Sequence, residues 1–174
     1  MTDFIAPAES APHTRTWMAW PTYADDYRLG TRPESYPDDL RATVGRLAAA
    51  IAENEPVALC AAPAQLEEAR RYCGDKVDLL PLPADDLWAR DTGPVFVRTA
   101  AGQKAAVNFN FNAWGGKEDI QDDATFARRV IDHLGVQEIK TQLVGEGGGL
   151  EYDGEGTLLL TESCWVNDNR NPGM

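Results

Sequence analysis

The run GPVFVRTAAGQKAAVNFNFNAWGGKEDIQDDATFARRVIDHLGVQEIKTQLV, from Gly93 to Val144, decides the fold. Two apolar segments, Gly93–Arg98 and Lys104–Asn112, flank a glycine-containing turn, which predicts two paired strands. Glu118–Leu134 then carries apolar residues at helical spacing and is followed by Gly135, which predicts a helix and its end. Ile139–Val144 is apolar again. The run therefore predicts a strand-strand-helix-strand unit.

The residues on either side extend this α/β pattern. Before the run we predict strands over 16–20, 57–61 and 77–82, helices over 36–54 and 63–72, and a loop over 22–33. In the first helix the apolar residues are Leu40, Val44, Leu47, Ala48 and Ile51. After the run we predict strands over 149–152 and 157–161, joined by the hairpin turn Asp153–Gly156. The order is not a regular alternation of strand and helix, which disfavours a simple Rossmann sheet.

Composition narrows the class of protein. The chain has 174 residues, which fits one globular domain, and its formal net charge is −12. Nucleic-acid binding needs a basic face, so it is not expected. No apolar run is long enough to cross a membrane and the N-terminus does not resemble a signal peptide. Three cysteines without zinc spacing indicate a reducing compartment and no metal, so we expect a cytoplasmic protein.

The densest polar and aromatic segment is Asp85–Pro94, in a predicted loop. Trp88 and Asp91 lie three residues apart, which offers a flat apolar wall beside a carboxylate. That combination suits a planar cation, because the ring favours cation–π contact and the carboxylate accepts paired N–H donors. The alternative is structural: Arg90 pairs with a neighbouring acid and Trp88 belongs to the core.

Two further segments are candidates for a binding site. Glu146 lies inside the glycine run 145–149, where a carboxylate makes a poor phosphate cradle and a plausible cation ligand. The alternative is a tight turn whose glutamate faces water. Trp114 follows a predicted strand and could wall a pocket or cap the core beneath the next helix.

The sequence offers weak support for a cysteine nucleophile. Cys164 ends a predicted strand but has no obvious base, because His13 and His133, the only two histidines, are both expected at the surface. Cys60 lies within an apolar strand and is expected in the core.

Taken together, these segments resemble the agmatine deiminases and the related bacterial peptidylarginine deiminases of the guanidine-modifying superfamily. The matching stretches are Thr16–Pro21, Asp85–Pro94, Phe111–Lys117, Glu146–Gly149, Asp153–Thr157, Thr161–Cys164 and Asn169–Pro172. The resemblance implies a pentein-like α/β-propeller of strand-strand-helix-strand units. It also implies hydrolysis of agmatine to N-carbamoylputrescine and ammonia in putrescine biosynthesis, with no metal or organic cofactor.

The resemblance implies a catalytic role for Asp91 and substrate contacts for Asp91, Glu146, Trp88 and, more weakly, Trp114. It also implies a His-x-Asp motif and a nucleophilic cysteine after Asn169–Pro172, and residues 1–174 contain neither. We therefore expect the N-terminal part of one catalytic domain, inactive alone, whose open strand edges favour self-association into a homo-oligomer. Peptidyl-arginine as substrate and a non-catalytic guanidinium-binding module remain alternatives, as does a mispredicted reading frame without function.

Overall fold

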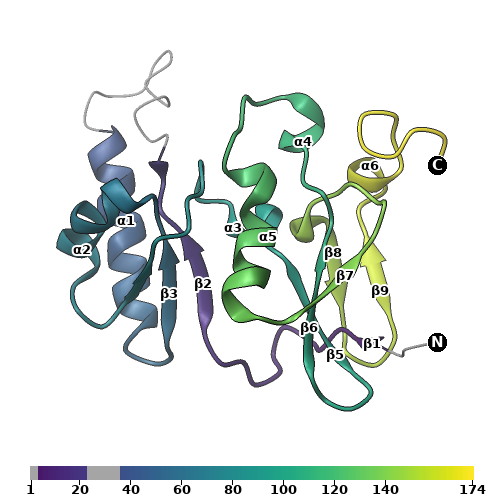
Figure 1. Ribbon diagram of the computed structural model, residues 1–174, viewed down its shortest axis with the longest axis horizontal. Helices are drawn as coiled ribbons and strands as arrows, with labels where there is room; N and C mark the ends of the chain where they lie inside the picture. The colour runs from purple at the N-terminus through teal and green to yellow at the C-terminus, as the bar shows by residue number, and fades with distance from the viewer. Residues whose placement is uncertain (1–3, 23–35) are drawn as a thin grey trace. The chain divides into compact units, whose positions relative to one another are not determined.

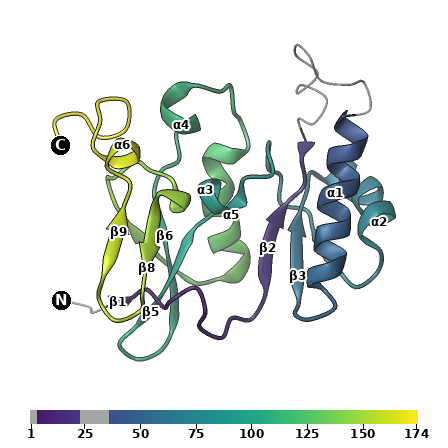
Figure 2. The ribbon, with the colours of Figure 1, turned by 180° about the vertical axis from the view of Figure 1, so that it is seen from behind.

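The computed structural model describes residues 4–22 and 36–174, and Figures 1 and 2 show its ribbon from the front and from behind. The chain divides into two compact units: residues 13–89 form one, and residues 1–12 with 90–174 form the other. The loop predicted over 22–33 lies almost wholly outside the described residues. Within 4–22 and 36–174, no helix is both long and apolar enough to cross a membrane.

The unit of residues 13–89 is a three-stranded parallel sheet with helical connections. Its elements are β2 (Thr16–Ala19), α1 (Tyr36–Ile51), β3 (Val57–Cys60), η2 (Pro63–Gln65), α2 (Leu66–Cys73) and β4 (Asp78–Leu80). The strands lie in the order β2-β3-β4, and Met18 pairs with Leu59, which pairs with Leu79. This part of the chain is thus a regular βαβαβ arrangement, although the chain as a whole is not.

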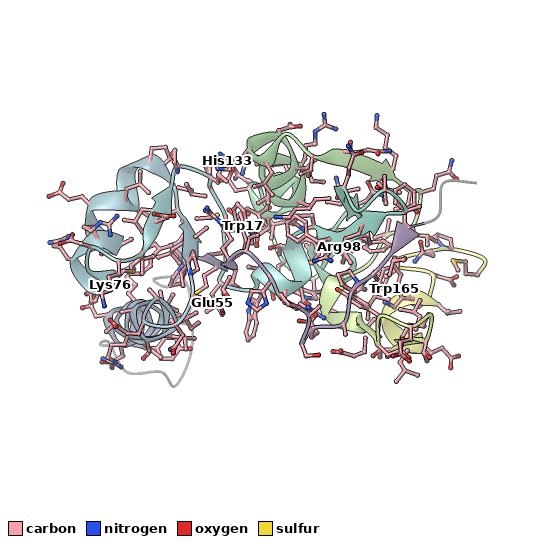
Figure 3. The ribbon with its side chains drawn as sticks, turned by 90° about the horizontal axis from the view of Figure 1, so that it is seen from below. Trp17, Glu55, Lys76, Arg98, His133 and Trp165 are labelled. Atoms are coloured by element: carbon pink, nitrogen blue, oxygen red, sulfur yellow. The ribbon has the colours of Figure 1, made fainter. Side chains whose placement is uncertain are left out.

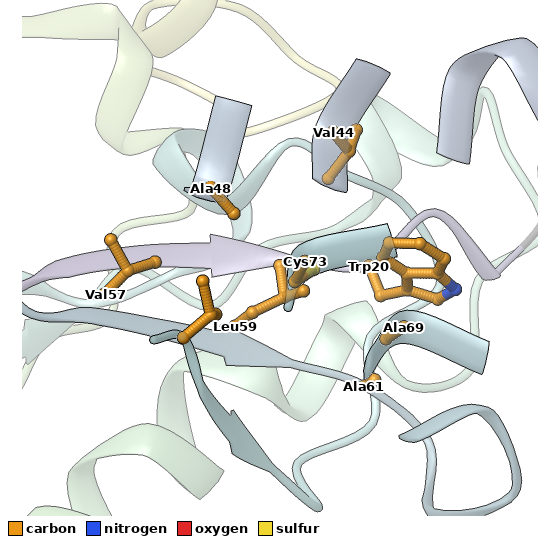
Figure 4. Close-up of a cluster of buried hydrophobic side chains, with 9 residues drawn as sticks. Trp20, Val44, Ala48, Val57, Leu59, Ala61, Ala69 and Cys73 are labelled. Carbon is orange, nitrogen blue, oxygen red and sulfur yellow. The ribbon is translucent and has the colours of Figure 1, made fainter. Parts of the chain in front are cut away.

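The core of this unit lies between the sheet and its helices, as Figure 4 shows. Trp20, Val44, Ala48 and Leu59 are among its buried residues. The prediction that Leu47 belongs to the apolar face of α1 is wrong, because 53% of this residue is exposed. Gly45 takes its place on the buried face. A Cβ at Gly45 would lie 2.5 Å from the Cβ of Tyr72, so α1 and α2 approach too closely for a side chain.

The other unit contains the predicted strand-strand-helix-strand arrangement. Its elements are β1 (Phe4–Ile5), α3 (Ala89–Thr92), which begins at the boundary, β5 (Val95–Thr99), β6 (Lys104–Asn108), α4 (Ala113–Gly116), α5 (Asp123–Leu134), β7 (Gln137–Lys140), η3 (Gly147–Gly149), β8 (Leu150–Tyr152), β9 (Leu158–Leu160) and α6 (Glu162–Trp165). The sheet order is β1-β5-β6-β7, with β5 and β6 antiparallel and β7 parallel to β6. The β8–β9 hairpin forms a separate two-stranded sheet, confirming the turn predicted at Asp153–Gly156.

Several element boundaries differ from prediction; for example, the strand predicted over 139–144 is β7, which spans Gln137–Lys140. The alternation Phe109-Asn110-Phe111-Asn112 does not extend β6, because Asn110 has φ = 52° and turns the chain. The helix predicted from residue 118 begins only at Asp123. Its buried face includes Phe126 and Val130. The short elements β1, α3, α4 and α6 have no period long enough to be read from sequence.

Cys60 is buried, as predicted, and burial raises the pKa of its thiol to about 12. Burial likewise raises the pKa of Cys73 to about 11, although Arg70 opposes that shift. In an unfolded chain a thiol ionises near pH ~8.5. Between pH ~9 and 11 the unfolded state therefore binds fewer protons, and the free energy of unfolding must fall as pH rises.

We expect urea midpoints measured at pH 7, 9 and 10.5 to decline, and to decline less in a Cys60→Ala, Cys73→Ala variant. The comparison between the two proteins removes the contribution of lysines and tyrosines, which also titrate in this range. Equal slopes in both proteins would contradict the role of the buried thiols.

Candidate functional site

Asp91 links three segments that are far apart in sequence. One of its oxygens, Oδ2, accepts a hydrogen bond from Nε1 of Trp114 at 3.0 Å, and Oδ1 accepts one from the backbone N–H of Gly148 at 3.2 Å. Within the part of the chain that the structure describes, no Lys or Arg forms an ion pair with Asp91. Two neutral donors thus fix the carboxylate while its charge stays uncompensated and each oxygen retains a lone pair.

The glycine run is needed for this close approach. A Cβ at Gly148 would lie 2.1 Å from Oδ1 of Asp91, and one at Gly147 would lie 2.5 Å from the carbonyl oxygen of Arg90. The run therefore packs against α3 and brings its own backbone N–H to Asp91. Nothing in the spacing of the sequence identifies Asp91, 57 residues earlier, as the residue that this run approaches.

Glu146 is buried, with 3% of the residue exposed, so the alternative of a glutamate facing water is wrong. Its Oε1 accepts hydrogen bonds from Nε and Nη2 of Arg170, at 2.9 and 2.6 Å. Its other oxygen, Oε2, is buried and has no hydrogen-bond partner in the described residues. A buried acceptor without a donor is costly, so this oxygen marks a point of the site where a donor is missing.

Arg170 is the residue that sequence reasoning missed. It appeared only inside the Asn169–Pro172 stretch, and nothing in its spacing showed a contact with Glu146, 24 residues earlier. The side chains of Arg170 and Glu146 are only 7% and 4% exposed. Both charged groups have lost their hydration, so the ion pair is stable only if its hydrogen bonds are well oriented in addition to the attraction of the charges.

Trp114 is presented by a strained turn. Ala113, Trp114 and Gly115 have φ values of 58°, 53° and 86°, in the left-handed region that non-glycine residues seldom adopt. Asn112 stabilises the turn through its Oδ1, which accepts a hydrogen bond from the N–H of Gly115. The Trp114 ring meets Phe111 edge to face, with centroids 4.9 Å apart.

The C-terminal segment ties these loops together. Nδ2 of Asn112 donates to the carbonyl of Asn169, and Asn171 both donates to and accepts from the backbone of Val144. Trp165, labelled in Figure 3, lies against Gly145, where a Cβ would be 2.4 Å from its ring. The segments carrying Trp114 and Glu146 therefore share one set of supports.

A cavity of about 750 Å³ is bordered by Trp114 and Arg170, but neither Asp91 nor Glu146 lines it. Its lining includes Trp114, Lys117, Cys164, Asp168 and Arg170. Cys164 is half-buried and neither histidine lines this cavity, so the structure adds no base for it. His133 lies exposed at the end of α5 (Figure 3), and His13 pairs with Glu55 in the other unit.

The remaining predicted residues have mixed outcomes. Trp88 is 52% exposed, so the alternative of a core tryptophan is wrong, and its role as a ligand wall stays a prediction. Arg90 does pair with an acid, but its partner is the distant Glu9. Partial burial would lower the pKa of Arg90, yet the hydrogen bond and charge of Glu9 outweigh it and raise that pKa.

No cluster of three or more potential metal ligands occurs in residues 4–22 and 36–174.

Comparison with known proteins identifies relatives along the whole chain. Residues 5–174 match the family described as Porphyromonas-type peptidyl-arginine deiminase. The agmatine deiminases of Ectopseudomonas mendocina and Pseudomonas aeruginosa (strain LESB58) are 43% and 41% identical over 178 residues, covering 98% of this chain and 47% of theirs. The chain thus spans about half the length of the curated relatives it matches.

The fold agrees with solved structures. An agmatine deiminase of Enterococcus faecalis superposes with a TM-score of 0.85 at 30% identity, over 98% of this chain and 47% of that one. This confirms the resemblance inferred from the motifs and the pentein-like α/β fold that it implied. Hydrogen bonds hold both carboxylates of the candidate site, Asp91 and Glu146. The chain that contains them belongs to the Porphyromonas-type peptidyl-arginine deiminase family.

Proposed function

We propose that residues 1–174 form the N-terminal part of the catalytic domain of a guanidinium hydrolase, and that they hold the cationic end of agmatine. The observation that carries this proposal is the state of the two carboxylates. Asp91 is fixed by neutral donors and keeps its charge, and Glu146 is fixed by Arg170 and keeps one buried oxygen without a donor. A guanidinium supplies planar N–H donors and the missing positive charge.

The same carboxylates would favour hydrolysis. Holding the guanidinium by its N–H groups fixes its orientation and keeps it cationic, so its carbon stays electrophilic. Attack of a cysteine thiolate at that carbon would expel ammonia, and addition of water to the covalent intermediate would then release the thiolate and leave N-carbamoylputrescine. The cysteine and His-x-Asp motif that the family resemblance requires have no match in residues 1–174. The proposal therefore assigns binding to this chain and turnover to a longer protein.

The proposal commits to agmatine over peptidyl-arginine. The curated relatives at 40–43% identity are named agmatine deiminases, whereas the matching family takes its name from peptidyl-arginine. A role in putrescine biosynthesis and a cytoplasmic location belong to the same proposal. The aromatic wall would be Trp114, whose ring provides a face for cation–π contact.

The test uses the indole N–H of Trp114 as a reporter, because it donates directly to Asp91. In a ¹H–¹⁵N spectrum we expect agmatine to shift this resonance, which the variant Trp114→Phe assigns. Putrescine, which lacks the guanidinium, is the matched control and should leave it in place. Asp91→Asn should weaken the response at least about tenfold, since a charged acceptor becomes neutral.

Two outcomes would refute the proposal. Equal shifts with agmatine and putrescine would show that the guanidinium is not what the site recognises. Release of ammonia from agmatine by the isolated chain, abolished by Asp91→Asn, would show that these residues suffice for turnover. An N-acylated arginine amide, titrated in parallel, tests peptidyl-arginine: stronger binding than agmatine would overturn the choice of substrate.

A further inference from the structure

Arg90 carries a guanidinium, the same chemical group that is proposed above as the ligand of Asp91, and it directly precedes Asp91 in α3. In the described residues this guanidinium forms no ion pair with Asp91. Its Nη1 donates to Oε1 of Glu9, and its Nη2 donates to the carbonyl oxygen of Leu150 at 3.3 Å and lies 3.9 Å from Oε1 of Glu151. An acid 81 residues away therefore holds the arginine that is next to the candidate ligand carboxylate.

The side chain of Arg90 nevertheless begins close to that carboxylate. A Cβ at Gly148 would lie 2.1 Å from Oδ1 of Asp91 and 3.6 Å from Cγ of Arg90, so the Arg90 stem passes beside the carboxylate. Consecutive residues of a helix point in different directions, but the guanidinium is at the flexible end of a long side chain. What keeps it off Asp91 is therefore the direction in which its partners hold it.

Glu9 is brought to Arg90 by the fold of the N-terminal segment. Strand β1 pairs with β5 just before this segment, as Figure 2 shows. The N–H of Ala11 then donates to the carbonyl of Ala8 at 2.9 Å, which closes a turn around Glu9. On the other side, a Cβ at Gly154 would lie 2.8 Å from the backbone nitrogen of Ala8, so the β8–β9 turn packs directly against this segment.

The Glu9–Arg90 pair contributes little to the stability of the fold. The two side chains are 56% and 46% exposed, and ion pairs in contact with water are weak because solvent screens their charges. A pair of this kind affects where a flexible guanidinium points more than it affects whether the chain folds.

We infer that Glu9 is a positioning residue that keeps the Arg90 guanidinium away from Asp91 and so leaves this carboxylate open to a guanidinium ligand. The inference rests on the proposed function, since it takes Asp91 as the carboxylate that binds agmatine. A guanidinium tethered one residue away competes at an effective concentration on the order of millimolar. Without Glu9, Arg90 would neutralise Asp91 and form the contacts expected of the substrate.

The indole resonance of Trp114 tests this in ligand-free protein, because that N–H donates to Asp91. We expect Glu9→Ala to shift the resonance, since Arg90 then pairs with Asp91, and Arg90→Gln to leave it near the wild-type position. Both substitutions break the same pair, but only Glu9→Ala releases a guanidinium. Glu151→Ala is the matched control: it removes an equal charge from beside Arg90, at 3.9 Å and beyond hydrogen-bond distance, and should shift the resonance much less.

Agmatine titration gives a second readout. If Arg90 occupied Asp91 for about two-thirds of the time, agmatine would bind about threefold more weakly, so Glu9→Ala should raise the half-saturating concentration at least about threefold. Adding Arg90→Gln to that variant should restore the wild-type value, which a merely structural role of Glu9 would not allow.

Two results in ligand-free protein would overturn the inference. Equal shifts in Glu9→Ala and Arg90→Gln would show that the pair only anchors the N-terminal segment, and an unchanged resonance in Glu9→Ala would show that Arg90 stays away from Asp91 without Glu9. If agmatine binds to none of these proteins, the proposed function fails, whereas the ligand-free comparison still decides what Glu9 does.

Discussion

Arg170→Met is expected to lower the free energy of unfolding by about 3–5 kcal/mol, the usual cost of removing one partner from a buried ion pair. The substitution leaves the charge of Glu146 in a site where only 3% of that residue is exposed. Oε1 would lose both of its donors, because both come from Arg170, and Oε2 already has none in the described residues. Urea unfolding followed by far-UV circular dichroism measures the loss.

The matched control is the same substitution in a Glu146→Gln background. A neutral amide carries no buried charge, so Arg170→Met should cost much less there. The double-mutant cycle isolates the interaction of the two side chains from the packing of Arg170. Equal losses in the two backgrounds would contradict the account and would attribute the effect of Arg170 to its other contact, with Asn169.

Gly148→Ala is expected to disturb the candidate site while leaving the stability of the fold nearly unchanged. The new Cβ would lie 2.1 Å from Oδ1 of Asp91, which is the end of a flexible side chain and can move. We therefore expect the Asp91 carboxylate to be displaced, the indole resonance of Trp114 to shift, and any response to agmatine to fall at least about tenfold. The free energy of unfolding should change by less than about 1 kcal/mol, since no backbone atom is in the way.

Gly145→Ala is the contrasting control. Its Cβ would lie 2.4 Å from the ring of Trp165, which is 5% exposed and has no room to move. That variant should lose about 1–3 kcal/mol of stability through overpacking. If Gly148→Ala instead proved as destabilising as Gly145→Ala, the glycine at 148 would be needed for the fold rather than for the placement of Asp91.

The sequence determined the long elements because their signals are local. Leu59 and its neighbours form an uninterrupted apolar run, and Phe126 and Val130 recur at the period of a helix. Periodicity failed at α1, where Leu47 is exposed and Gly45 is buried. The reason is that α2 packs so closely against α1 that only glycine fits at the contact. A prediction based on hydrophobic side chains does not recognise a glycine as a buried position.

The sequence by itself determined the α/β pattern, the family and the candidate residues Asp91, Glu146 and Trp114, since each of these depends on the order of residue types along the chain. Only the tertiary structure decided what holds them. The Trp114–Asp91 bond joins residues 23 apart, the Gly148–Asp91 bond residues 57 apart, and the Arg170–Glu146 pair residues 24 apart. Such contacts depend on where loops meet after the sheets form, and buried polar groups must then find donors in whatever the fold brings near them.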